Sequence, residues 1–196
     1  KVITSFSMFY DLEDPCEFAR QVYDCLDGDG IWVLEQSYMP EMLRANSFDT
    51  VCHEHLSYYG MRQLKYIMDS AGFKIIDFEF NDVNGGSISV VVSPGGKECT
   101  TKLAGIIGLE LESKLNTRQP WDEFASRITD NNHKFLKIVR DLREEGYKVA
   151  GLGASTKGNV TLQTWGITPN DILAVGDVNP DKHGSLTPGT WIAIKN

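Results

Sequence analysis

The chain has 196 residues, of which 41% are hydrophobic and 23% charged, a balance typical of a folded globular protein rather than a disordered one. Its formal net charge is −8, with no lysine or arginine run, so we expect no nucleic-acid partner. No apolar segment approaches the length of a membrane span, so we expect no membrane partner either. The four cysteines lie far apart without a Cys-x-x-Cys pair, which favours reduced thiols and a cytoplasmic location.

Strands and helices alternate along the first part of the chain. Residues 2–8 predict a buried strand, and Asp14 with Pro15 then opens a helix whose apolar residues recur at helical spacing. A glycine turn leads into a strand at 31–36, and residues 61–71 predict a second helix that Gly72 closes. Two β-rich stretches follow directly, at 74–80 and 87–92, which predicts an antiparallel pair at the end of the sheet.

The sequence PGGK at 94–97 marks the predicted domain boundary, which divides the chain into residues 1–94 and 95–196. Beyond it we expect a helical region to about residue 145, including a long amphipathic helix. A strand at 147–153, a glycine-rich turn, a helix and a strand at 172–178 follow. The chain is therefore predicted to be an α/β protein with two domains.

The chemically richest segment is residues 46–59, which read NSFDTVCHEHLSYY. Imidazole titrates near neutral pH, and a neighbouring carboxylate can hold or polarise it, so His53, Glu54 and His55 could form a general base with its partners. The two histidines could instead be structural, since residues two apart on a strand point to the same face. We favour the functional interpretation because the residues cluster close to the end of a predicted strand.

A metal site is a further hypothesis for this segment, because the Cys52 thiolate and the imidazoles of His53 and His55 are good zinc ligands. Ligands this close in sequence rarely complete a tetrahedral site by themselves, and no second cluster supplies the rest. We therefore expect no metal.

A second candidate site is the run GLGASTKG at 151–158, between a predicted strand and a predicted helix. Glycines let a ligand approach the backbone there, and helix N-terminal amides attract anions. Ser155, Thr156 and Lys157 add hydroxyls and a positive charge, while Asp177 is placed to meet a ribose hydroxyl. The spacing matches neither the dinucleotide nor the Walker pattern. A tight turn with a solvated lysine is the alternative; we favour phosphate or diphosphate binding.

Motifs along nearly the whole chain follow the order of one protein family. The early motifs are Asp14-Pro15, the strand at 32–38, NSFDT at 46–50, HEHL at 53–56 and GGS at 85–87. They resemble the C-terminal half of a class I S-adenosylmethionine-dependent methyltransferase domain, in the branch of the nucleotide-sugar C-methyltransferases. The last third resembles that family's C-terminal α/β domain, through GLGASTKGN at 151–159, DVNPDK at 177–182 and LTPGT at 186–190. The implied fold is half of a Rossmann-like methyltransferase sheet followed by a second, small Rossmann-like α/β domain.

The resemblance implies C-methylation beside the ketone of a nucleotide-linked keto-deoxysugar. His55 matches the family's proposed base, which removes the α-proton, and Glu54 matches the acid that positions the sugar or the enolate. We give His53 an orienting or structural role. Cys52 and Asp11 stand where members often have a tyrosine and a further histidine. The expected cofactor contact for S-adenosylmethionine is Ser7, and the expected substrate contacts are Tyr38, Tyr58, Ser155, Thr156, Lys157, Asn159 and Asp177.

Members of this family begin with a cysteine-rich zinc-binding region and a glycine-rich cofactor loop, neither of which is in this sequence. We expect the chain to be a fragment of a longer enzyme, inactive alone and weak in binding S-adenosylmethionine. We also expect self-association through the exposed edge of its first strand.

Two other classes of protein stay open on the sequence. One is a nucleotide-binding oxidoreductase that uses 151–158 as a dinucleotide turn. The other is a non-catalytic sugar-nucleotide-binding or scaffold protein.

Overall fold

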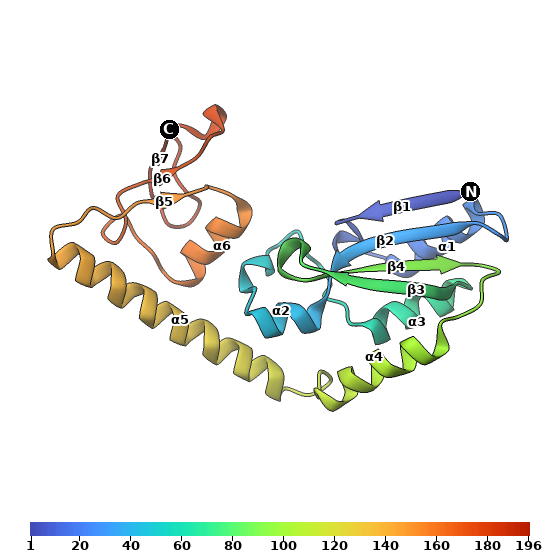
Figure 1. Ribbon diagram of the computed structural model, residues 1–196. Coiled ribbons are helices and arrows are strands. Elements are labelled where there is room, and N and C mark those ends of the chain that lie inside the picture. Colours follow the sequence, from blue (N-terminus) through green and yellow to red (C-terminus); the bar gives the residue numbers. More distant parts are fainter. The chain divides into compact units, whose positions relative to one another are not determined.

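The computed structural model describes all 196 residues, which form two compact units (Figure 1). Unit 1 comprises Lys1–Ser47 and His53–Asp122, and unit 2 comprises Phe48–Cys52 and Glu123–Asn196. Both units contain helices and strands, so the α/β fold class is confirmed. The predicted boundary at 94/95 coincides with the end of the sheet of unit 1. The spatial division falls later, because α4 (Thr100–Glu112) packs on α3 (Met61–Ala71) within the same unit.

The sheet of unit 1 has four strands in the order β1-β2-β4-β3. Strands β1 (Val2–Phe6) and β2 (Ile31–Ser37) are parallel, so their carboxyl ends lie at the same edge. Strand β4 (Ser87–Ser93) is antiparallel to both β2 and β3 (Lys74–Asn81), which confirms the predicted antiparallel pair. In α/β sheets of this kind the edge formed by the carboxyl ends of parallel strands is where ligands bind.

Local signals set the ends of the two main helices of unit 1. Helix α1 (Pro15–Cys25) begins where the Asp14 carboxylate accepts the backbone N–H of Glu17 at 2.8 Å, with proline in the first turn. Helix α3 ends at Gly72, whose φ of 92° is left-handed and suits glycine. The shorter elements of unit 1 are η1 (Phe9–Asp11), α2 (Met39–Ala45) and η3 (Val83–Gly85), whereas η2 (Phe48–Thr50) belongs to unit 2.

The core of unit 1 is built around Trp32 of β2, which is completely buried. Its indole N–H donates to the Ser5 hydroxyl of β1 at 2.9 Å, so its one polar group is satisfied. The rings of Phe9, Phe18 and Phe73 lie 5.7, 6.0 and 5.6 Å from it, centroid to centroid. These contacts pack η1 and α1 against the face of the sheet that carries Trp32.

A buried acid joins three elements of unit 1. Glu110 of α4 is only 5% exposed, and its Oε1 accepts the Tyr38 hydroxyl at 2.7 Å and the backbone N–H of Met61 at 2.5 Å. Its Oε2 accepts the backbone N–H of Arg62 at 3.1 Å. The carboxylate thus caps the N-terminus of α3, where unpaired amides and the helix dipole favour negative charge. It also holds Tyr38, the residue that follows β2.

Unit 2 has a three-stranded parallel sheet, with β5 (Gly151–Leu152), β6 (Val175–Gly176) and β7 (Ile194–Lys195) in that order. These strands are shorter than predicted, although the pairing continues through the Leu173 N–H, which donates to the Val149 carbonyl at 2.9 Å. Apolar residues of this sheet and its loops form a separate core (Ile167, Ile172, Val175, Ile192, Ile194). The other elements are α5 (Gln119–Glu144), which begins in unit 1, α6 (Thr156–Thr164) and η4 (Pro180–Lys182).

The outer edge of β1 has no neighbouring strand, and Val2 and Phe6 are exposed beside it. The self-association predicted from the sequence would use this edge. Light scattering over a range of protein concentrations tests that prediction, and a monomer at every concentration would contradict it.

None of the helices is both long enough and apolar enough to serve as a membrane span.

Replacement of Glu110 by alanine should destabilise unit 1 by about 2–4 kcal/mol, because the Tyr38 hydroxyl and two α3 amides would lose their acceptor. Chemical denaturation measures the change in the free energy of unfolding. The matched control is Glu112→Ala, in the same helix but exposed, which should change stability by less than about 0.5 kcal/mol. Equal effects of the two variants would show that Glu110 has no special role.

Candidate functional site

The histidine segment lies in an irregular turn after η2. His53 and Glu54 are exposed, and His55 is half-buried. The His55 imidazole packs on the ring of Tyr10, with the two ring centroids 4.3 Å apart and the planes tilted by 50°. All three predicted catalytic side chains are thus at or near the surface of the turn, and one of them rests on a fixed aromatic ring.

The backbone of Tyr10 also holds this turn. Its carbonyl oxygen accepts the N–H of Leu56 at 3.0 Å and the N–H of Ser57 at 3.1 Å. Tyr10 belongs to η1, which follows β1, so these bonds tie His55 to the carboxyl end of that strand. Sequence reasoning missed Tyr10. Its neighbour Asp11 was noted, but no spacing links residue 10 to residue 55.

The other predicted residues of unit 1 also lie after strands β1 and β2. Ser7 follows β1 and is exposed; its φ of 53° turns the chain, and its N–H donates to the Glu35 carbonyl at 2.9 Å. Tyr38 follows β2, but it is buried and its hydroxyl donates to Glu110. Burial raises the pKa of Tyr38, and the bond to Glu110 raises it further. Tyr58, three residues after His55, is half-buried.

The predicted strand-turn-helix is present in unit 2. The Ser155 hydroxyl caps α6 by accepting the N–H of Gly158 at 3.1 Å, so that hydroxyl is used within the turn. Ser155 and Thr156 are exposed, and Lys157 is half-buried. The side-chain oxygen of Asn159 is buried without a hydrogen-bond partner in the protein.

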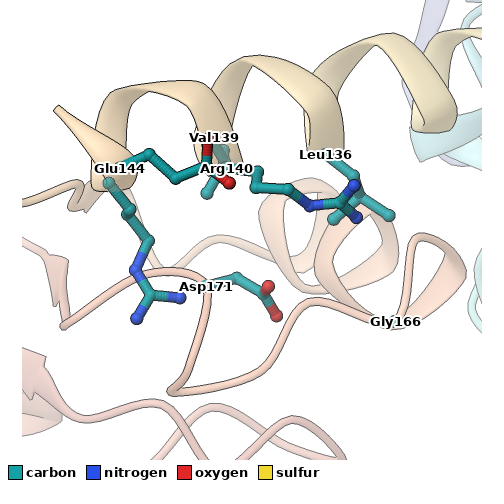
Figure 2. Close-up of a pocket in the computed structure, with 7 residues that line it drawn as sticks. Leu136, Val139, Arg140, Glu144, Gly166 and Asp171 are labelled. Atoms are coloured by element: carbon teal, nitrogen blue, oxygen red, sulfur yellow. The ribbon is translucent and has the colours of Figure 1, made fainter.

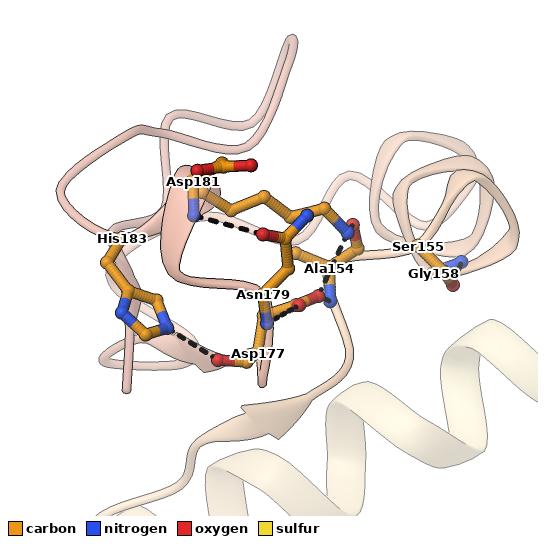
Figure 3. Close-up of polar contacts among 8 residues, drawn as sticks. Ala154, Ser155, Gly158, Asp177, Asn179, Asp181 and His183 are labelled. Carbon is orange, nitrogen blue, oxygen red and sulfur yellow. Dashed lines mark hydrogen bonds and ion pairs between the residues drawn. The ribbon is translucent and has the colours of Figure 1, made fainter.

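Asp177, predicted to meet a ribose, holds its own loop through several hydrogen bonds (Figure 3). Its carboxylate accepts the Asn179 N–H at 2.9 Å, the Ala154 N–H at 2.7 Å and the Lys182 ammonium at 3.1 Å. These bonds lower the pKa of Asp177, the Asn179 N–H most and the Lys182 side chain next. Lys182 also donates to the Ala154 carbonyl at 2.9 Å, so it links the loops that follow β5 and β6. Asp177 and Lys182 both belong to the sequence motif 177–182, but the sequence did not indicate that their side chains form an ion pair.

An open pocket of ≈ 400 Å³ lies where β5 and β6 end. The glycine backbone of Gly153 and Gly176 lines it, together with Leu152 and Val178, whose side chains are 93% and 96% exposed. These exposed apolar side chains flank glycines at the carboxyl ends of parallel strands, where ligands bind in α/β sheets. Asp177 and Asn196 complete the lining.

A second pocket of unit 2, of ≈ 440 Å³, lies along the last turns of α5 (Figure 2). Arg140 and Arg143 line it opposite Asp171. The Asp171 carboxylate accepts the Thr168 N–H and hydroxyl at 2.9 and 2.7 Å, and Arg143 donates to the Asn170 carbonyl. Cations are favoured near a helix C-terminus, so the two arginines have a structural reason to be there. None of the predicted site residues lines this pocket.

The histidine turn has no ligand set for a metal. No three His, Cys, Asp or Glu side chains of the chain come together as metal ligands, and this includes Cys52, His53 and His55.

Two family profiles together match almost the whole chain. The profile described as "C-methyltransferase C-terminal domain" matches residues 82–196, and the profile described as "Methyltransferase domain" matches residues 1–77. The C-methyltransferase NovU of Streptomyces niveus is 32% identical over 188 residues. These cover 95% of this chain and 45% of that protein, so the chain spans less than half the length of this relative.

The crystal structure of the methyltransferase CalO6 superimposes with a TM-score of 0.40 and 17% sequence identity, covering 47% of this chain and 35% of that one. A match at this level adds nothing to the fold described above.

Replacement of Asp177 by asparagine should make unit 2 less stable at neutral pH and less sensitive to acid. A carboxylate whose pKa is lowered on folding contributes stability above its ordinary pKa of 3.8 and loses it as the pH falls through the lowered value. Thermal unfolding from about pH 7 to about pH 3 should therefore show a smaller decline in the variant. The control is Asp181→Asn, an exposed acid of the same loop. A decline as steep in Asp177→Asn as in the unmodified chain would contradict this assignment.

Proposed function

Since the chain belongs to the C-methyltransferase family, we propose that it supplies the proton-abstracting and sugar-nucleotide-binding parts of an S-adenosylmethionine-dependent C-methyltransferase. The proposed substrate is a nucleotide-linked keto-deoxysugar. The observation that carries the proposal is the position of His55, a half-buried imidazole held at the carboxyl edge of the β1–β2 pair in a chain of this family.

His55 acts as the general base in this proposal. The proton leaves the carbon next to the sugar ketone and passes to the imidazole, and the C–H electron pair becomes the enolate. The enolate carbon would then bond to the methyl group of S-adenosylmethionine as the methyl–sulfur bond breaks, and its electron pair would stay on sulfur as a neutral thioether. Imidazole suits this step because its ordinary pKa lies close to neutral pH. Glu54, which is exposed next to His55, is proposed to accept hydrogen bonds from sugar hydroxyls, and His53 is given an orienting role.

S-adenosylmethionine, when bound, supplies an electrophilic methyl group. Ser7 is the predicted contact to it from this chain. The exposed hydroxyl of Ser7 at the end of β1, next to the loop that carries Tyr10, fits that assignment.

The turn of unit 2 is proposed to hold the nucleotide diphosphate. The first amides of α6 and the Lys157 side chain favour an anion, and Thr156 adds an exposed hydroxyl. Leu152 and Val178 offer apolar surface to a flat base across the glycine backbone of the ≈ 400 Å³ pocket. Asp177 acts indirectly here, by fixing the two loops through Ala154 and Lys182.

In an enzyme that contains residues 1–196, His55→Asn should lower kcat by roughly 10²–10⁴-fold with little change in KM, because the variant keeps the size and polarity of the side chain but not its basicity. Exchange of the α-proton of the sugar with deuterated solvent should be lost together with methylation. His53→Asn is the matched control and should cost less. Near-normal turnover in His55→Asn, or undiminished α-proton exchange, would move the base elsewhere.

Lys157→Ala should weaken binding of a nucleoside diphosphate by roughly tenfold to a hundredfold, the value of one charge-assisted hydrogen bond. Calorimetric titration with thymidine and uridine diphosphates measures this on the chain itself. Lys148→Ala, which removes an exposed lysine of the same unit, is the control and should bind normally. Equal affinities of the two variants for a nucleoside diphosphate would contradict the proposal that this turn binds the diphosphate.

A further inference from the structure

Tyr10 contacts the proposed base, yet neither the motifs of the sequence nor the mechanism above gives it a role. Its ring centroid is 4.3 Å from that of His55. The distance is at the short end of the range for paired aromatic rings. The two residues are 45 positions apart, so this contact is made by the fold.

Tyr10 is itself held firmly. It is only 7% exposed and belongs to the main core of unit 1, next to Phe9, whose ring packs on Trp32. The η1 turn is closed by the Asp11 N–H, which donates to the Met8 carbonyl at 3.1 Å. Tyr10 therefore provides a fixed surface, whereas the histidine turn has no helix or strand of its own.

Tyr10 restrains the histidine turn in two ways. Its carbonyl accepts the two amides that follow His55, which fixes the backbone directly after the imidazole. Its ring lies against the imidazole, which restricts the plane of the His55 side chain. A turn restrained only through its backbone would leave the imidazole free to rotate about two side-chain bonds, so the ring contact accounts for the orientation of His55.

The face of an aromatic ring carries negative charge density and attracts cations. Once His55 has taken a proton, the imidazolium lies against the Tyr10 ring. The contact is therefore stronger after proton transfer than before it, which is the property that lowers a barrier rather than merely improving binding.

We propose that Tyr10 is a positioning residue for His55, which it orients by ring contact and whose protonated form it stabilises during removal of the substrate α-proton. This inference rests on the proposed role of His55 as the base. The aromatic ring is the part of Tyr10 that matters, so phenylalanine should replace it and an aliphatic residue should not.

The contact can be tested on this chain by nuclear magnetic resonance. The ring current of Tyr10 should displace the His55 ring-proton signals, which the His55→Asn variant assigns by their loss. Tyr10→Phe should keep the displacement and Tyr10→Leu should abolish it. The control Tyr66→Leu removes an exposed tyrosine of α3 and should leave the His55 signals unmoved. Should Tyr10→Leu fail to fold, His55→Leu provides the reciprocal measurement, a shift of the Tyr10 ring signals.

The kinetic test uses an enzyme that contains residues 1–196. Tyr10→Leu should lower kcat by roughly threefold to thirtyfold, the range expected from one cation–aromatic contact, with KM little changed. Tyr10→Phe should restore most of the rate. Loss of solvent exchange at the sugar α-carbon should parallel the loss in kcat.

The outcomes separate this inference from the proposed function. If His55→Asn abolishes turnover while Tyr10→Leu retains it, or if the His55 signals ignore the loss of the Tyr10 ring, Tyr10 is not a positioning residue and the base assignment survives. If His55→Asn itself retains normal turnover, both assignments fail together. If Tyr10→Phe loses as much rate as Tyr10→Leu, the hydroxyl and not the ring is responsible, and the inference is overturned.

Discussion

The buried carboxylate of Glu110 is the contact on which the architecture of unit 1 depends. It brings α4 against the N-terminus of α3 and the end of β2 with three hydrogen bonds, at the place where those elements would otherwise leave amides and a phenol unpaired. Gly60 shows how closely the elements approach, since a Cβ atom there would lie 2.9 Å from the Glu110 Oε1. The acid thereby fixes the orientation of the chain that returns to α3 after the histidine turn.

Two other loops that follow strands are also held by a single acceptor that receives several hydrogen bonds. The Tyr10 carbonyl gathers two amides of the histidine turn, and the Asp177 carboxylate gathers two amides and an ammonium between the loops of unit 2. In each case a single acceptor satisfies several donors of irregular backbone, which makes the loop rigid without adding secondary structure. Exposed groups such as Glu54 and Thr156 are then held at defined positions.

Two residues that the sequence predicted as substrate contacts also make hydrogen bonds within the protein. The Tyr38 hydroxyl is used by Glu110, and the Asp177 carboxylate is used by its own loop. Tyr38 and Asp177 each lie in a loop that directly follows a strand. A polar residue in such a loop can either bind a ligand or hold the loop that binds it. Membership of the C-methyltransferase family supports a methyltransferase over an oxidoreductase.

Local chemistry determined much of the fold. The Asp14–Pro15 cap began α1, Gly72 ended α3, and two adjacent β-rich stretches produced an antiparallel pair, since caps, left-handed glycines and alternation act within a few residues. The histidine turn and the turn before α6 were also recognisable, because their reactive residues are consecutive. Tyr10 beneath His55, Glu110 against Tyr38 and Lys182 across to Ala154 were decided only by the tertiary structure. These partners are 45, 72 and 28 positions apart, and no sequence spacing encodes a contact that forms only after strands and helices have packed.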